Sequence, residues 1–194
     1  EIRQRTLGRL RDHLEMFEAN AVDAGAHVHW ARDAEEARRI IVDIGKRHGV
    51  TLATKGKSMA SEEIHLGEAL EEAGIEPVET DLGEWIIQLA KEPPFHIIAP
   101  AIHKPRSEIV ALLREASGGE LQSEEIPELV ATARRILRQR FLDAGMGITG
   151  GNILVSETGS LVLVTNEGNG RLCSSAPPVH VALVGIEKVA PTWD

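Results

Sequence analysis

A run of hydrogen-bonding side chains and glycines directly follows the apolar segment 161–164. Its candidate ligand-binding residues are Asn166, Gly168, Asn169, Gly170 and Arg171. The two glycines favour positive φ angles and a close approach of the backbone to a ligand. The Arg171 guanidinium can pair with a carboxylate or a phosphate through two N–H groups. The alternative is a turn chosen for its geometry alone. Because so many hydrogen-bonding groups follow one buried strand, we interpret the loop as part of a binding site for a small anion.

A second candidate segment, residues 55–58 with the sequence Lys-Gly-Lys-Ser, follows a predicted strand and enters a predicted helix. Parallel sheets covered by helices bind ligands at this end of their strands. The Lys55 side chain, the backbone amides of Gly56 and Ser58 and the Ser58 hydroxyl can hold a phosphate or a carboxylate. A solvated turn, in which Ser58 or Ser61 caps the next helix, fits the sequence equally well.

One carboxylate, Glu157, lies in the turn 156–159 with the sequence Ser-Glu-Thr-Gly, where a predicted strand ends. It can act as a nucleophile or a general base if the sheet directs it into a cleft. The alternative is an exposed turn residue, which the sequence alone favours.

The segment 145–150 matches the pattern Gly-x-Gly-x-x-Gly. A dinucleotide site needs these glycines after a strand and before a helix, whereas here a predicted helix precedes them and a predicted strand follows. We therefore interpret the segment as a helix end and a flexible turn.

Metal ligands are scarce in the chain. His27 and His29 share one face of a predicted short strand, but no third ligand is evident, so no metal site is predicted. Cys173 is the only cysteine, which excludes an internal disulfide and any multi-cysteine metal site within this chain. A lone cysteine and a charged first stretch without a signal peptide are typical of a cytoplasmic protein.

The composition excludes several partner classes. The 194 residues suffice for one domain, residues 1–194, and 21 Lys and Arg against 30 Asp and Glu give a net charge of −9. This charge repels phosphate backbones, and aromatic residues make up only 3% of the chain, so no nucleic-acid partner is expected. The apolar runs are too short for a membrane span. Because the first residue is Glu rather than Met, we expect natural flanks outside this chain.

Hydrophobic periodicity and the positions of glycine and proline predict an alternation of helices and strands. Helices are predicted at about 2–24, 34–48, 59–73, around Trp85, 105–117 and 127–141, and strands at 27–30, 50–54, 77–80, 95–99, 153–155, 161–164 and 179–184. This alternation is typical of an α/β fold with a mostly parallel sheet, helices on both faces and one antiparallel hairpin at Thr158-Gly159.

Two long stretches, residues 54–64 and 147–171, resemble the lactate-utilisation protein B family, and so do the shorter motifs 178–181 and 185–188. The resemblance identifies the chain as similar to the LUD domain of that family. It implies the fold shared by glucosamine-6-phosphate deaminase, ribose-5-phosphate isomerase and coenzyme A transferases. It also implies partner subunits and a role in oxidising L-lactate to pyruvate.

Members of this family carry [4Fe–4S] clusters in a cysteine-rich region that follows the LUD domain. With Cys173 alone, this chain lacks such a region, so we expect no cofactor in this piece and clusters only in the full-length protein.

Three functional hypotheses remain open. In the first, a cleft lined by residues of the two segments 55–58 and 166–171 holds a small carboxylate or phosphate for a lactate-oxidising complex. In the second, the chain is a coenzyme A transferase-like or sugar-phosphate enzyme that uses Glu157. The turn 156–159 shares three of four residues with the Ser-Glu-Asn-Gly motif of some such transferases. In the third, the chain is a non-catalytic scaffold for the other lactate-utilisation subunits.

Overall fold

The computed structural model of the chain describes residues 2–96 and 99–194. Its central sheet is parallel throughout, with the strand order β2-β1-β3-β6. The strands are β1 (Leu52–Gly56), β2 (Glu76–Glu79), β3 (Met146–Thr149) and β6 (Val179–Ala182). Every residue of the two central strands, β1 and β3, is buried, as expected for strands covered on both faces. The predicted α/β class is confirmed.

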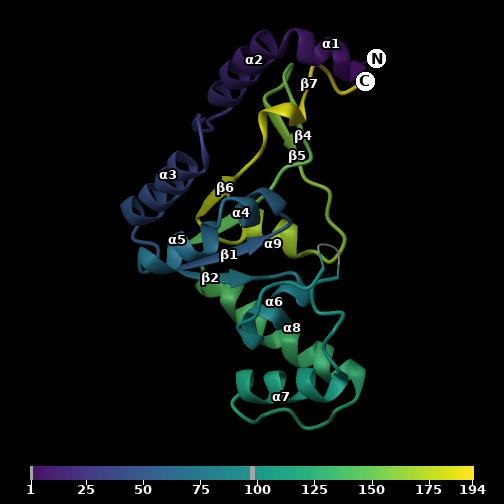
Figure 1. Cartoon of the computed structure of the whole chain (residues 1–194). Coiled ribbons are helices and arrows are strands. Elements are labelled where there is room, and N and C mark those ends of the chain that lie inside the picture. Colours follow the sequence, from purple (N-terminus) through teal and green to yellow (C-terminus); the bar gives the residue numbers. More distant parts are fainter. Residues whose placement is uncertain (1, 97–98) are drawn as a thin grey trace.

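Helices cover both faces of this sheet (Figure 1). They are α3 (Ala34–Arg47), α4 (Met59–Glu63), α5 (Leu66–Glu72), α6 (Leu82–Ala90), α8 (Ile126–Asp143) and α9 (Asn169–Ser175). Helix α7 (Arg106–Ala116) packs on α6 and α8, farther from the sheet (Figure 1). On one face Ile41 of α3 and Leu66 of α5 pack with Ala53, and on the other Trp85 of α6 and Leu137 of α8 pack with Leu52. Neighbouring residues of β1 point to opposite faces, so one short strand anchors both hydrophobic clusters.

A second sheet lies apart from the first, near the two chain ends (Figure 1). It contains β4 (Ile153–Val155) between β5 (Ser160–Val162) and β7 (Val189–Ala190), next to a short 3-10 helix, Ile186–Lys188. Strands β4 and β5 form the predicted antiparallel hairpin. Helices α1 (Ile2–Gly8) and α2 (Leu10–Asp23) complete this part, where Phe17 packs with Leu154.

Several predicted elements differ in the structure. The helix predicted at 2–24 is interrupted at Arg9, whose φ of −129° is not helical. Residues 27–30 form no strand, because they pair with no neighbouring strand among the described residues. In the strand predicted at 95–99, Phe95 and His96 form a bend, and residues 97–98 lie outside the described residues.

Two corrections affect the candidate site. Strand β1 runs to Gly56, two residues beyond the predicted end, so Lys55 lies in a buried strand rather than in a loop. The segment predicted as the loop 166–171 becomes helical from Asn169 onward.

The segment 145–150 is also no turn, because most of it is β3. A Cβ on Gly147 would lie 1.7 Å from the Cys173 carbonyl oxygen, so glycine there lets α9 pack directly on the sheet.

Candidate functional site

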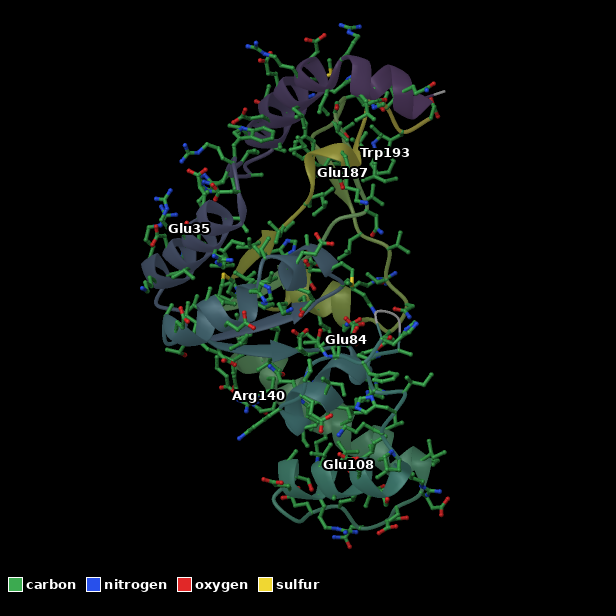
Figure 2. The ribbon with its side chains drawn as sticks, viewed as in Figure 1. Glu35, Glu84, Glu108, Arg140, Glu187 and Trp193 are labelled. Carbon is green, nitrogen blue, oxygen red and sulfur yellow. The ribbon has the colours of Figure 1, made fainter. Side chains whose placement is uncertain are left out.

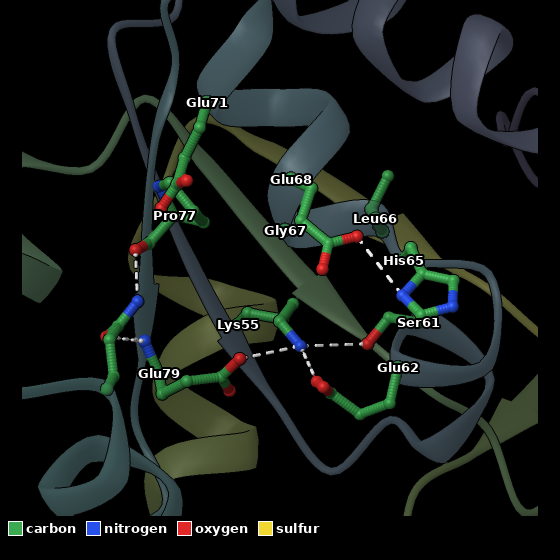
Figure 3. Close-up of a pocket in the computed structure, with 11 residues that line it drawn as sticks. Lys55, Ser61, Glu62, His65, Leu66, Gly67, Glu68, Glu71, Pro77 and Glu79 are labelled. Carbon is green, nitrogen blue, oxygen red and sulfur yellow. Dashed lines mark hydrogen bonds and ion pairs between the residues drawn. The ribbon is translucent and has the colours of Figure 1, made fainter. Parts of the chain in front are cut away.

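Lys55 and Glu79 lie opposite each other where β1 and β2 end. The Lys55 side chain is only 3% exposed, and its Nζ atom lies 2.7 Å from Glu79 Oε1. The same Nζ atom donates to Ser61 Oγ at 3.1 Å and pairs with the Glu62 carboxylate (Figure 3). The buried ammonium group therefore has three partners, which together offset the loss of its hydration.

Burial and pairing act in opposite directions on these groups. Burial lowers the pKa of Lys55, but the attraction of Glu79 and Glu62 outweighs it, so the pKa is raised and the side chain stays charged. For Glu79, burial is the larger effect and raises its pKa to about 7, although Lys55 opposes the shift. Glu79 is therefore an acid that exchanges its proton near neutral pH.

Lys57 connects three segments at the same edge of the sheet. It adopts a left-handed conformation, with a φ of 57°. Its backbone N–H donates to Asp81 Oδ2 at 3.1 Å, and its ammonium group pairs with the Asp81 carboxylate. Glu167 Oε1 lies 3.5 Å from the same nitrogen. The end of β1, the residues after β2 and the loop before α9 are thus joined through one lysine.

A buried polar cluster lies beneath Lys57. Thr80 Oγ1 donates to the Lys55 carbonyl oxygen at 2.9 Å and accepts from Asn169 Nδ2 at 3.3 Å. Asn169 is 5% exposed, and its Oδ1 atom is buried without a hydrogen-bond partner among the residues that the structure describes. Because a buried amide oxygen without a donor is costly, this atom is suited to a ligand that brings an O–H or N–H group.

The close packing of this cluster explains Gly56. A Cβ at this position would lie 2.6 Å from Thr80 Oγ1 and 3.1 Å from Asn169 Nδ2. Glycine at this position therefore allows the end of β1 to lie against the start of α9.

These side chains form the floor of a cleft of about 1150 Å³ at the carboxyl ends of β1 and β2. One wall comes from α8 and another from the segment 164–172. The structure brings five of the predicted site residues to this cleft: Lys55, Gly56, Ser58, Asn166 and Asn169. Segments more than a hundred residues apart thus meet at the edge where parallel sheets bind ligands.

A smaller cavity of about 180 Å³ lies on the other side of Lys55 (Figure 3). Lys55, Glu62 and Glu79 line both cavities, so this ion-pair network is the wall between them. Gln88 of α6 also lines the smaller cavity and bonds to β2 through Pro77 O at 2.8 Å and Glu79 N–H at 3.0 Å. The free edge of β2 is thereby covered.

Other predicted site residues lie outside the cleft. Gly168 has the expected positive φ, 88°, at the start of α9. Gly170 is a close-packing position, since a Cβ there would lie 2.8 Å from Thr165 Cγ2. Arg171 is exposed in the first turn of α9 and does not line the cleft.

Ser58 lines the cleft and also caps α4. Its hydroxyl oxygen accepts from the Ser61 backbone N–H at 3.1 Å, so the predicted cap is present.

Glu157 lies in the part of the molecule that holds the second sheet. Its side chain is exposed, and its Oε1 atom accepts the Trp193 backbone N–H at 2.7 Å. Figure 2 shows Trp193 near the chain ends, far from Glu84, which lines the cleft. This position does not favour the hypothesis of a transferase that uses Glu157.

The acidic residues of the site were not predicted from the sequence. Glu62, Glu79 and Asp81 line the cleft and neutralise the two lysines. The available signal was the position of Asp81 directly after the predicted strand 77–80, the same signal that identified residues 55–58. Carboxylates in such places bind or orient polar ligands as readily as lysines do.

The donor set does not fit a metal cofactor. Among residues 2–96 and 99–194, no group of three His, Cys, Asp or Glu side chains is arranged to hold a metal ion. An iron–sulfur cluster needs several cysteine thiolates, whereas Cys173 is single and fully buried, and burial raises the pKa of its thiol. Within the described residues, no helix is both long and apolar enough to cross a membrane.

Comparison with known proteins identifies relatives along the whole chain. The LUD domain family matches residues 14–194. The chain is 43% identical over 194 residues to "Uncharacterized electron transport protein YkgF" of Escherichia coli. It is 45% identical over 195 residues to "Lactate utilization protein B" of Bacillus licheniformis and 44% identical over 194 residues to that of Bacillus cereus. The matches cover all of this chain but only 40% to 41% of these relatives. No solved structure matches the chain.

Proposed function

Because the chain belongs to the LUD domain family, we propose that it is the LUD domain of an iron–sulfur protein that acts with partner subunits in oxidising L-lactate to pyruvate. The names of its relatives, "Lactate utilization protein B" and an electron transport protein, support this proposal. The chain spans about two fifths of those relatives. We therefore assign the electron-transferring clusters to the remainder of the protein. The single cysteine of this chain cannot provide the several thiolates that a cluster needs.

Within the complex, the cleft at the ends of β1 and β2 binds a small organic anion, a carboxylate or a phosphate. The observation that carries this proposal is the Asn169 Oδ1 atom, which is buried in the floor of the cleft and has no hydrogen-bond partner in the described part of the chain. An α-hydroxy acid brings both a hydroxyl donor for this oxygen and a carboxylate for a nearby cation.

The two lysines are already paired, which limits their part in binding. Lys55 is held by Glu62 and Glu79 beneath the surface, so it fixes the shape of the floor. Lys57 is 19% exposed and shared between Asp81 and Glu167, so it can turn one N–H toward a ligand. Lys57 is therefore the floor cation that we expect to contact the anion.

The test is lactate oxidation by the reassembled complex that contains the full-length protein with Asn169→Asp. This substitution preserves the shape but replaces the amide with a negative charge, so we expect the KM for lactate to rise at least tenfold. Gln122→Glu adds the same charge at an exposed residue that does not line the cleft and serves as the matched control. Wild-type kinetics for Asn169→Asp in a folded protein would exclude the cleft floor as the lactate site.

A further inference from the structure

One face of α8 forms a complete wall of the cleft. Its six lining residues are Val130, Ala133, Arg134, Leu137, Arg138 and Phe141. They recur at intervals of three and four residues, which places them on one side of the helix. The wall is therefore built by a continuous helical face and not by scattered contacts.

This face has an inner and an outer row. The inner row, Ala133, Leu137 and Phe141, is apolar and buried. In the outer row Val130 is 48% exposed, and Arg134 and Arg138 are exposed four residues apart. A ligand on this wall would meet apolar groups at depth and two guanidinium groups toward the opening.

The two arginines differ from the other cations of the cleft. Lys55 and Lys57 are each paired with two carboxylates, whereas neither Arg134 nor Arg138 makes an ion pair with any residue that the structure describes. Like charges four residues apart on a helix repel each other and destabilise it. An anion that bridges both groups would remove this repulsion.

Two neighbouring arginines on other faces of α8 show the opposite pattern. Arg135 lies 3.4 Å from Glu120 and Arg140 lies 3.1 Å from Glu76. Arginines of this helix that face away from the cleft thus have carboxylate partners on the protein, while those that face it have none within residues 2–96 and 99–194.

The size of the cleft adds an independent argument. Its volume of about 1150 Å³ exceeds the roughly 300–1000 Å³ typical of sites for drug-sized ligands. A three-carbon acid such as lactate would fill only a small part of this volume.

We propose that the cleft also binds an anionic organic molecule larger than lactate, whose oxyanion group pairs with Arg134 and Arg138 and whose apolar part lies against Val130 and the inner row. The chemical class is a phosphorylated or carboxylated metabolite or cofactor with an apolar ring or chain. Guanidinium groups suit both oxyanions because their N–H groups match the oxygens in pairs. The proposal uses the same cleft as the proposed function but a different wall.

The experiment is calorimetric titration of the purified full-length protein with anilinonaphthalene sulfonate, a probe with an aromatic body and one oxyanion. We expect the double variant Arg134→Ala/Arg138→Ala to bind at least tenfold more weakly. Arg135→Ala/Arg140→Ala removes the same charge from the same helix and should bind within twofold of wild type. Thermal melting of each variant confirms that it is folded.

A second pair of variants tests the contact between the apolar part of the probe and α8. Val130→Asn should weaken probe binding several-fold, whereas Ile126→Asn, at a 63% exposed position of α8 outside the cleft, should not. Competition by inorganic phosphate but not by pyruvate would assign the arginines to phosphorylated ligands, and the reverse to carboxylates.

No probe binding by the wild type, or equal loss in both arginine double variants, would overturn the proposal. Neither result bears on lactate oxidation by the Asn169→Asp complex, which tests the floor alone. Conversely, normal lactate oxidation by the Asn169→Asp complex would not contradict the proposal that Arg134 and Arg138 bind an anion.

Discussion

The Lys55 Nζ atom lies 2.7 Å from the Glu79 Oε1 atom, at the carboxyl ends of two neighbouring parallel strands and between two cavities. In this position the pair closes the inner end of the cleft. The pair also neutralises charge within the floor of the cleft. Lys55, which the sequence suggested as a ligand-binding residue, is already paired with carboxylates of the protein.

Replacing Lys55 with methionine should destabilise the protein strongly. It leaves Glu62 and Glu79 facing each other without a cation, and breaking a buried pair in this way costs about 3–5 kcal/mol. Urea unfolding followed by tryptophan fluorescence measures the loss. Lys46→Met, at an exposed position of α3, should change the free energy of unfolding by less than about 0.5 kcal/mol.

The double variant Lys55→Met/Glu79→Gln tests whether the loss comes from uncompensated charge. Since it removes the cation together with its buried partner, it should be more stable than Lys55→Met alone by about 1 kcal/mol or more. A double variant no more stable than the single one would assign the loss to packing.

Glu79 should make stability depend on pH near neutrality. Its pKa is raised to about 7 in the folded protein, against about 4.3 in an unfolded chain. The stability that the bound proton of Glu79 contributes is therefore fully present below a pH of about 4.3. It is lost as the pH rises through about 7, and the loss is at most about 4 kcal/mol.

The measurement is the difference in unfolding free energy between wild type and Glu79→Gln across this range. Gln cannot titrate, so the variant should gain relative to wild type as the pH rises, while other groups cancel in the difference. Glu63→Gln, at an exposed position of α4, should track wild type throughout. Parallel curves for wild type and Glu79→Gln would contradict the shifted pKa.

Gly56→Ala should lower stability by about 1–3 kcal/mol, because the new methyl group would overlap Thr80 Oγ1 at 2.6 Å. Gly67→Ala is the matched control, since a Cβ in this helical position of α5 meets nothing within 4 Å and replaces a poor helix former. We expect that control to melt at the same temperature as wild type or higher. Equal melting temperatures for both variants would show that β1 can move away from α9.

Arg171→Ala should leave lactate oxidation by the complex within twofold of wild type. The sequence singled out this arginine as an anion ligand, but the structure places it on the exposed side of α9, outside the residues that line the cleft. Steady-state kinetics with lactate tests this expectation, with Lys57→Met as the comparison that should raise the KM. A large loss in Arg171→Ala alone would place the anion site at α9.

The α/β class and the family were predictable because both depend on local patterns. Apolar runs such as the one that enters β1 and the amphipathic spacing of α8 indicate burial directly, whatever their partners in the fold. The motif stretches 54–64 and 147–171 are contiguous in the chain, so they could be identified without knowledge of the fold. The position of residues 55–58 at the ligand-binding edge also followed, because they include and follow the end of the buried parallel strand β1. Residues 166–169 instead follow β5 of the second sheet, and the packing of α9 against β1 and β3 brings them to the same edge.

The charge state of the site was decided only by the tertiary structure. Lys55 and Glu79 are 24 residues apart, and they meet because the register of β1 and β2 sets them opposite each other. A shift of that register by one residue would turn one of them to the other face of the sheet. Sequence spacing contains no information on this register. The sequence therefore suggested Lys55 as a ligand-binding residue but could not identify its carboxylate partners.

The same reason explains the remaining differences. Arg134 and Arg138 are ordinary exposed helix residues in the sequence, and only the packing of α8 against the strand ends directs them into the cleft. Glu157 stands in a motif-like turn, yet its strand belongs to the second sheet. Local periodicity determines which face of an element is buried, whereas the long-range contacts that choose its neighbours arise only when the whole chain folds.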